Sequence, residues 1–238
     1  MQKIMFNDKY GLTKAVLDRI KTQTRRIPDI QPPYKNSEIC FPTDFLLDDK
    51  PEKHPLWMAY CWKNKDNQEE FTPWVKPRYK EGETVAVAQS YKTIDDFYKA
   101  AFPYNHSVHG MTISEFDGVS DEDVRKWNMI AVNYRGKKVW TNKLFVKPEL
   151  MLHFLRITKV RMQRLQDISE EDCLKEGINK LVPGDGIPRY RVMDRNGERM
   201  YSTDDYKDAY RFLINGTSGK GTWEKNPYVW VYDFELIK

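Results

Sequence analysis

The stretch LHFLRITKVRMQRL, residues 152–165, is the longest part of the chain with the apolar pattern of a β-strand. Apolar and polar side chains alternate along it until Thr158 and Lys159, where the alternation slips, which indicates a bulge or a bend. A second stretch, YVWVYDFEL at residues 228–236, carries an aromatic ring at almost every second position. Two long strands of this kind favour an antiparallel sheet around one core.

Short helical patterns lie between the expected strands. Residues 12–20 have apolar positions at helical spacing, with Thr13 as the expected N-cap. Ser169 and the three acidic residues after it are close to a capping box, which predicts a helix that ends before Gly177. Further strands are expected at 3–6 and 84–91, and further helices at 95–101, 121–127 and 204–215. Regular alternation of strands and helices is absent, so the expected fold class is α+β, with antiparallel strands and short flanking helices.

The composition limits the class of protein. The 238 residues include 39 Lys and Arg against 35 Asp and Glu, and 40% of the residues are hydrophobic. This mixture excludes a polycationic tail and provides enough apolar residues for a folded core. No stretch approaches the roughly 18 apolar residues of a membrane span, and the first eight residues turn polar too early for a signal peptide. We therefore expect a cytoplasmic protein that does not contact a membrane.

The cysteines and histidines do not indicate a metal centre or a disulfide framework. The three cysteines are Cys40, Cys61 and Cys173. Their odd number and wide spacing favour a reducing compartment without disulfide bonds. His106 and His109 form an HxxH pattern without further ligands nearby. The phosphate-like run GTSGKG, residues 216–221, follows a helix instead of a strand, and we expect no metal, nicotinamide, flavin or ATP as cofactor.

Several runs of the sequence resemble the ASCH-domain family, and most closely its phage-associated subgroup. The runs are FN at 6–7, KTQTRR at 21–26, GE at 82–83, RITKVR at 156–161, RLQDISEED at 164–172, EGI at 176–178 and WEKNPYVWVYDFE at 223–235. The resemblance implies a single domain over residues 1–238, a PUA-like antiparallel β-barrel with large insertions at about 29–76 and 92–138. It also implies a function related to RNA or nucleobases, by analogy of fold.

The chain more distantly resembles the bacterial acetylcytidine amidohydrolases of that family. Matched motif to motif, their catalytic Lys, Thr and Glu correspond to Lys21, Thr24 and Glu176. A Thr hydroxyl becomes a nucleophile when a base removes its proton, and a Lys is such a base when burial lowers its pKa. A carboxyl group can pass the proton to the leaving amine. A purely structural interpretation stays open, because Lys21 and Glu176 also suit helix ends and Thr24 suits a turn or strand.

The residues beside this motif form a candidate binding site. The expected ligand-binding residues are Thr22, Arg25, Arg26, Gln89 and Tyr91. They include part of the basic segment 14–26, in which Asp18 is the single acid, and arginine forms paired hydrogen bonds with phosphate. The subgroup usually has Glu where this chain has Gln89, whose amide does not titrate and cannot act as a carboxylate. The alternating rings at 228–234 are expected to lie in the core.

Three functions follow as alternatives. The first is binding of RNA, a nucleotide or a nucleobase in a cleft near residues 21–26, without catalysis. The second is an amidohydrolase that deacylates a modified nucleoside such as acetylcytidine. The third is a phage-derived protein-interaction factor whose two insertions form the binding surface. Whether Lys21, Thr24 and Glu176 converge in one pocket discriminates between the first two.

Overall fold

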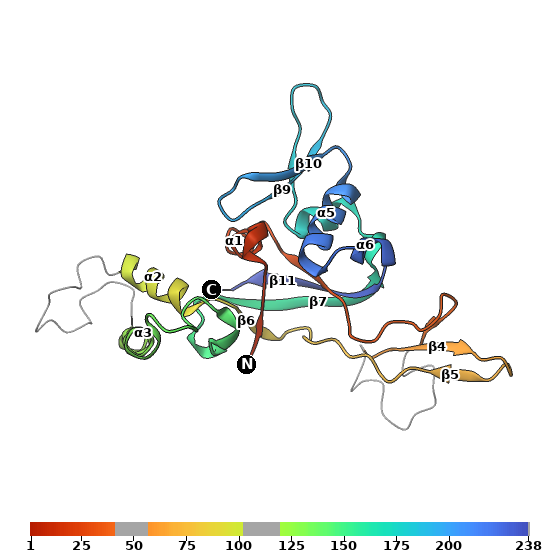
Figure 1. The fold of residues 1–238 in the computed structure, drawn as a ribbon, viewed down its shortest axis with the longest axis horizontal. Helices are drawn as coiled ribbons and strands as arrows, with labels where there is room; N and C mark the ends of the chain where they lie inside the picture. Colours follow the sequence, from red (N-terminus) through yellow and green to blue (C-terminus); the bar gives the residue numbers. More distant parts are fainter. Residues whose placement is uncertain (41–56, 102–119, 238) are drawn as a thin grey trace, which may run out of the picture. The chain divides into compact units, whose positions relative to one another are not determined.

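The computed structural model describes residues 1–40, 57–101 and 120–237, drawn in colour in Figure 1. Within these ranges the chain is a mixed α+β protein, as the sequence predicts. The contacts divide the chain into two compact units. The first comprises residues 1–6, 84–155 and 237–238, and the second comprises residues 7–83 and 156–236. A single domain with a closed PUA-like barrel stays a prediction.

The first unit combines two short strands with two helices. Its elements are β1 (Gln2–Ile4), β6 (Thr84–Val87), α2 (Tyr91–Ala101), α3 (Asp121–Tyr134) and the single turns η5 (Lys143–Phe145) and η6 (Pro148–Leu150). β1 and β6 pair in parallel, with Lys3 opposite Ala86. The prediction of antiparallel strands is therefore wrong for this pair. The long chain between β1 and β6 provides the crossover that parallel pairing requires.

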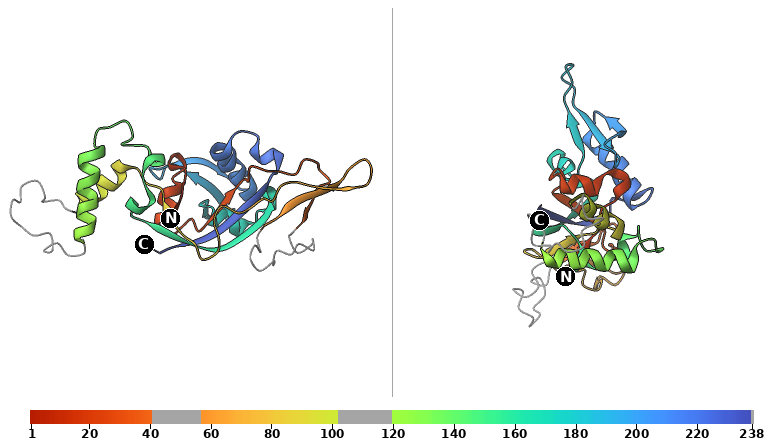
Figure 2. Two further views of the ribbon diagram at one scale, coloured as in Figure 1. Left: turned by 90° about the horizontal axis from the view of Figure 1, so that it is seen from below. Right: turned by 90° about the vertical axis from the view of Figure 1, so that its left-hand side faces the viewer.

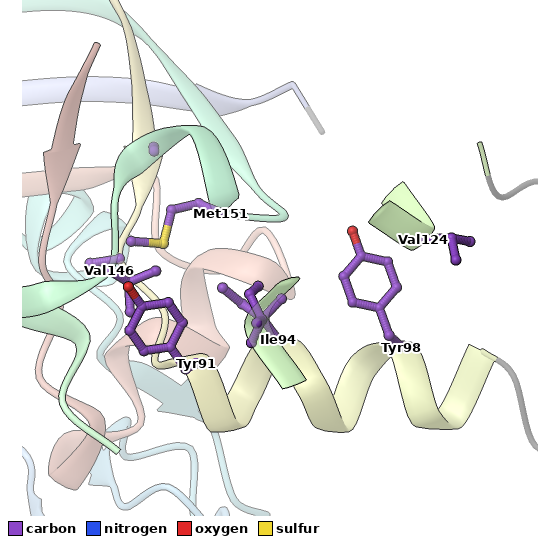
Figure 3. Packing of buried hydrophobic residues seen from close by; sticks show 9 residues of the cluster. Tyr91, Ile94, Tyr98, Val124, Val146 and Met151 are labelled. Atoms are coloured by element: carbon purple, nitrogen blue, oxygen red, sulfur yellow. The ribbon is translucent and has the colours of Figure 1, made fainter. Parts of the chain in front are cut away.

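An apolar cluster holds α2 and α3 together in this unit (Figure 3). Its buried members are Ala86, Ala88, Tyr91, Ile94, Tyr98, Val124, Ile130, Val146 and Met151. Tyr91, Ile94 and Tyr98 lie at helical spacing on one face of α2. The ring of Tyr91 stacks on that of Tyr134, with 4.0 Å between the ring centroids. Because this packing supports turns beyond the local pattern, α2 begins before residue 95 and α3 continues past residue 127.

The second unit contains the two strands that the sequence indicates most clearly, apart from residues 154 and 155 of the first of them, which belong to the first unit. Its elements are η1 (Asp8–Tyr10), α1 (Leu12–Leu17), β2 (Gln23–Arg26), β3 (Glu38–Cys40), β4 (Ala59–Lys63), β5 (Glu69–Phe71), β7 (Phe154–Arg164), η7 (Leu165–Asp167), α4 (Glu170–Lys175), β8 (Asn179–Leu181), β9 (Arg189–Met193), β10 (Arg199–Thr203), α5 (Tyr206–Ser218), α6 (Thr222–Lys225) and β11 (Tyr228–Leu236). β11 lies between β7 and β2, and it pairs with β2 in antiparallel register. Smaller antiparallel sheets have the orders β10–β9–β8 and β3–β4–β5, and the β4–β5 hairpin is orange in Figure 2.

β7 confirms the slip that the sequence predicts near residues 158 and 159. Leu155 and Ile157 are buried at alternate positions, and the next buried residue is Val160. The backbone N–H of Val160 donates to Oε1 of Glu81 at 2.8 Å. A side-chain carboxylate therefore satisfies the backbone where the alternation changes.

Local hydrogen bonds explain where two of the helices begin. Oγ of Ser169 accepts the N–H of Asp172 at 3.1 Å, so the expected cap of α4 is confirmed. The prediction that Thr13 caps α1 is wrong, since Gly11 precedes this helix with a φ of +61°. The Thr13 hydroxyl donates to Asp8 instead. The preceding turn η1 ends in this left-handed glycine, and α1 continues directly from it.

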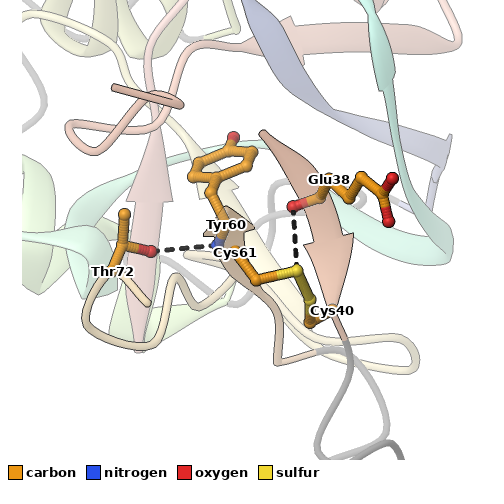
Figure 4. The surroundings of a disulfide bond; sticks show 5 residues. All are labelled: Glu38, Cys40, Tyr60, Cys61 and Thr72. Carbon is orange, nitrogen blue, oxygen red and sulfur yellow. Dashed lines mark hydrogen bonds between the residues drawn. A yellow bond between two sulfur atoms is a disulfide. The ribbon is translucent and has the colours of Figure 1, made fainter. Parts of the chain in front are cut away.

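The expectation of reduced cysteines is also wrong. Cys40 and Cys61 form a disulfide bond, with their Cα atoms 6.3 Å apart (Figure 4). β3 and β4 pair in antiparallel register with Glu38 opposite Cys61 and Cys40 opposite Ala59, which brings the two thiols together. Cys173 is a free, buried thiol.

Within residues 1–40, 57–101 and 120–237, no helix has the length and apolar character needed to span a membrane.

Gly216 on α5 provides a test of the packing in the second unit. A Cβ at this position would lie 1.9 Å from the hydroxyl oxygen of Tyr10. We expect Gly216→Ala to lower the free energy of unfolding by roughly 1–3 kcal/mol, because the Tyr10 ring must move out of its packed position. Urea denaturation measures the change. Gly184→Ala is the control, since no atom lies within 4 Å of a Cβ at Gly184. Equal losses of stability in the two variants would contradict the prediction.

Candidate functional site

The backbone of the predicted motif 21–26 is held from two sides in the second unit. The N–H of Thr22 donates to the carbonyl of Lys175 at 2.9 Å, at the end of α4. The carbonyl of Thr22 accepts the N–H of Phe234 on β11, also at 2.9 Å. Thr22, a predicted ligand-binding residue, is half-buried and connects α4 to β11 through its backbone.

Lys21 and Glu176, which the resemblance assigns to one site, contact each other. Nζ of Lys21 donates to Oε2 of Glu176 at 2.5 Å and to its carbonyl oxygen at 2.8 Å. The two side chains are only 1% and 6% exposed. Gly177 suits the turn after Glu176, because it has a φ of +101°, which glycine adopts without strain. Burial lowers the pKa of Lys21, and the negative charge of Glu176 partly opposes that effect.

Arg25 connects this pair to a second carboxylate. Its Nη1 lies 3.0 Å from Oε1 of Glu176, and its Nη2 lies 2.6 Å from Oδ2 of Asp172. Arg161 in turn bridges Asp172 and Asp233, at 3.0 Å and 2.5 Å. With Gln23, which donates to both Asp172 and Asp233, these groups form what we call the ion-pair network. Its members are Lys21, Gln23, Arg25, Arg161, Asp172, Glu176 and Asp233.

Thr24 leaves β2 on the face opposite to Gln23 and Arg25, because side chains alternate along a strand. In the register of β2 and β11, Thr24 lies opposite Tyr232, whereas Gln23 lies opposite its partner Asp233. Within the described part of the chain, Thr24 is buried and takes no part in the ion-pair network. The structure thus brings two of the three predicted catalytic residues together and places the third on the other face of the strand.

The face of β2 and β11 that carries Thr24 combines aromatic rings with arginines. Along β11, Tyr228, Trp230 and Tyr232 occupy alternate positions on this face. Cζ of Arg164 lies 3.8 Å from the centroid of the Tyr228 ring, and Arg26 lies opposite Trp230 in the register. The backbone N–H of Arg78 donates to the Tyr232 hydroxyl at 2.9 Å. We call the following residues the arginine–aromatic face: Arg26, Arg78, Arg164, Tyr228, Trp230 and Tyr232.

This face has both accessible and buried members. Arg78 is exposed, and Arg26, Arg164 and Tyr228 are half-buried. Trp230 and Tyr232 are buried, so the expectation that these rings belong to the core is confirmed. Burial lowers the pKa of Arg26, and the nearby Tyr79, Glu176 and Tyr232 partly oppose that effect.

Gln89 and Tyr91, the other predicted ligand-binding residues, belong to the first unit. Oε1 of Gln89 accepts the N–H of Leu152 at 2.9 Å, and the side chain is buried. The Tyr91 hydroxyl donates to the carbonyl of Phe145 at 3.3 Å. These contacts hold the turns between α3 and β7, so both residues have a structural role in the first unit.

The expectation of no metal concerns His106 and His109, which lie outside the described residues. Among the residues that the structure does describe, no group of three or more His, Cys, Asp or Glu side chains is placed to hold a metal ion. Much of the two predicted insertions, residues 41–56 and 102–119, lies outside the described ranges as well.

Asp172, Asp233 and Arg164 lie in runs that resemble the ASCH family but are not among the predicted site residues. Asp172 is expected only in the cap of α4, where its N–H does bond to Ser169. The position of Asp233 could have indicated a buried ion pair, since it follows the buried residues Val229 and Val231 on the same face of β11. A carboxylate that continues a buried apolar row needs a charged partner.

Comparison with known proteins gives no relative for this fold and site. No family model matches the sequence, and neither a curated protein nor a solved structure matches it significantly.

The ion-pair network predicts a dependence of stability on pH. Burial alone would raise the pKa of Asp172, but hydrogen bonds from Gln23 and the charge of Arg25 outweigh it and lower this pKa below 3.8. The stabilisation is therefore complete above the unfolded-state pKa and is lost as the pH falls through the folded-state pKa. We expect Asp172→Asn to lower the free energy of unfolding at pH 7 by roughly 1–3 kcal/mol.

Urea denaturation at pH 7 and pH 3 measures this effect. The difference in stability between the wild type and Asp172→Asn should be smaller at pH 3, because Asp172 binds a proton more readily after unfolding. Glu171→Gln is the control, since its side chain on the same helix is 76% exposed. A difference that does not change with pH would contradict the prediction.

Proposed function

We propose that this protein binds single-stranded RNA or a nucleotide on the arginine–aromatic face. The observation that supports the proposal most is the stacking of Arg164 on the ring of Tyr228, with Arg26 opposite Trp230 in the strand register. The backbone N–H of Arg78, an exposed residue, bonds to the hydroxyl of Tyr232, the third ring of this face. Guanidinium groups bind phosphates, and their planes and aromatic rings stack on bases.

The ion-pair network supports this function by holding β2 in place. Lys21, Arg25 and Glu176 satisfy one another in the interior, which fastens β2 to the end of α4. Three cations and three carboxylates balance within the network, so its interior charges are matched within the protein. The resemblance of residues 21–26 to the ASCH motif points to the same class of ligand.

Removal of the arginines should weaken binding and its dependence on salt. We expect Arg26→Ala and Arg164→Ala each to reduce the affinity for a fluorescently labelled single-stranded RNA. Each should also lower the slope of log affinity against log salt by about 1, because one phosphate contact is lost. Fluorescence anisotropy over a series of salt concentrations measures both quantities.

Arg156→Ala is the matched control for this experiment. Arg156 is a 55% exposed arginine of β7 that pairs with Glu235 at 3.7 Å. The Arg156→Ala variant should bind RNA with a slope of log affinity against log salt close to that of the wild type. Thermal unfolding of each variant separates lost binding from lost structure. Wild-type protein that binds neither RNA nor nucleotides, or slopes that are equal in all variants, would contradict the proposal.

A second candidate is the deacylation of a modified nucleoside such as acetylcytidine. One observation favours it: burial lowers the pKa of Lys21, which lies 2.5 Å from the carboxylate of Glu176. A lowered pKa is what a lysine base requires. The Thr24 hydroxyl must then reach Lys21 when the substrate is bound, since the two groups are not joined in the structure described above.

Thr24 allows a test of this candidate that leaves the buried charges intact. Thr24→Val removes the hydroxyl at nearly constant volume and should abolish release of acetate from acetylcytidine, by a factor of about 100 or more. Thr24→Ser keeps a hydroxyl and should retain activity within about tenfold of the wild type. Chromatography of the nucleoside product measures turnover. Equal turnover in Thr24→Val and the wild type, or none in the wild type, would exclude this mechanism.

A further inference from the structure

The Cys40–Cys61 disulfide closes a ring of contacts around Tyr228 of the arginine–aromatic face. Gln31 forms two hydrogen bonds with the backbone of Tyr228, donating to its carbonyl at 3.0 Å and accepting its N–H at 2.9 Å. The chain then leads to β3, and the disulfide joins β3 to Cys61 of β4. The neighbour of Cys61 is Tyr60, whose ring lies 5.4 Å from that of Tyr228.

The disulfide is the strongest connection within this ring. β3 has three residues and pairs with β4 over three positions, which is short for a stable strand pair. Figure 4 shows the bond between β3 and β4, with Tyr60 next to Cys61 on β4. Both cysteines are partly exposed, so a small thiol can reach them.

The Tyr60 side chain is buried in an unfavourable way, so reduction of the disulfide should allow it to move. Its side chain is completely buried, and its hydroxyl has no hydrogen-bond partner among the described residues. A buried hydroxyl without a partner favours conformations that expose it to water. Tyr60 thus keeps its place against Tyr228 because neighbouring contacts hold it there, and Arg164 stacks on that same Tyr228 at 3.8 Å.

We propose that the Cys40–Cys61 disulfide is a reversible switch that holds Tyr60 against Tyr228 and thereby controls ligand binding at the arginine–aromatic face. The ligand part of this inference rests on the proposed function. In the oxidised form Tyr228 is fixed beneath Arg164, and in the reduced form Tyr60 separates from Tyr228. The face is then less ordered and binds more weakly.

The chemistry is exchange with a small dithiol. A thiolate of the dithiol attacks one sulfur of the pair, which forms a mixed disulfide and releases the other cysteine as a thiolate. The second thiolate of the reagent then displaces the remaining cysteine. Two electrons pass from the dithiol to the protein, each released cysteine takes up a proton, and the reagent becomes a cyclic disulfide. The same exchange in reverse, with a small disulfide as the oxidant, restores the Cys40–Cys61 bond and releases two small thiols.

Hydrogen exchange followed by mass spectrometry tests the structural half of the proposal. The full chain is compared before and after treatment with dithiothreitol, and alkylation establishes the state of Cys40 and Cys61. We expect reduction to increase exchange at least fivefold in residues 57–63 and 226–230. Alkylation of both cysteines without prior reduction, or exchange that reduction leaves unchanged, would overturn the switch.

Binding of labelled single-stranded RNA tests the ligand half. We expect reduction to weaken binding at least threefold, and the double variant Cys40→Ser, Cys61→Ser to bind like the reduced wild type whether or not dithiothreitol is present. Cys173→Ala is the control that keeps the response, because Cys173 is outside the disulfide. Tyr60→Phe removes the unpartnered hydroxyl, so its response to reduction should be smaller than that of the wild type.

The two proposals fail in different ways. If neither redox form binds RNA or nucleotides but exchange still responds to reduction, the proposed function is wrong and the coupling of the disulfide to Tyr60 is supported. If RNA binds equally to both forms, the proposed function stands and the control by the disulfide is wrong.

Discussion

The buried contact between Lys21 and Glu176 is the constraint on which the second unit depends. A charged amine that is almost completely excluded from water needs a carboxylate beside it, and Glu176 provides one at 2.5 Å. This requirement places the start of β2 against the end of α4, where the positive φ of Gly177 turns the chain. A buried pair of this kind adds little stability compared with apolar packing, yet loss of one partner costs about 3–5 kcal/mol. It therefore acts mainly to select one arrangement of the chain.

Side chains along β2 point alternately to its two faces, so this strand of four residues has two different surroundings. Gln23 and Arg25 face the ion-pair network, while Thr24 and Arg26 face the rings of β11. Charges on the first face are matched within the protein and hold the strand. Arg26 on the second face is half-buried and lies opposite Trp230 in the register, and the proposal of a binding surface depends on this side of the strand. Neighbouring residues of one short strand thus face two different surroundings.

Local patterns allowed much of the fold to be predicted. The strands β7 and β11, the change of face near residue 158 and the cap of α4 follow from side-chain alternation and from one hydroxyl, which act over a few residues. The approach of Lys21 to Glu176 was expected only from the resemblance to a family, since the two residues are 155 positions apart. The parallel pairing of β1 with β6 and the pairing of Cys40 with Cys61 gave no local signal.

The sequence by itself determined that β7 and β11 are strands and that α4 and α5 are helices, because hydrophobic periodicity and capping groups lie in neighbouring residues. It also determined that positive charge gathers at residues 14–26. Only the tertiary structure decided which of those charges are buried and matched and which remain beside aromatic rings. That outcome depends on the register between β2 and β11, where a shift of one residue would exchange the two faces of the strand. Register results from many weak contacts between distant segments, and no single stretch of sequence contains them.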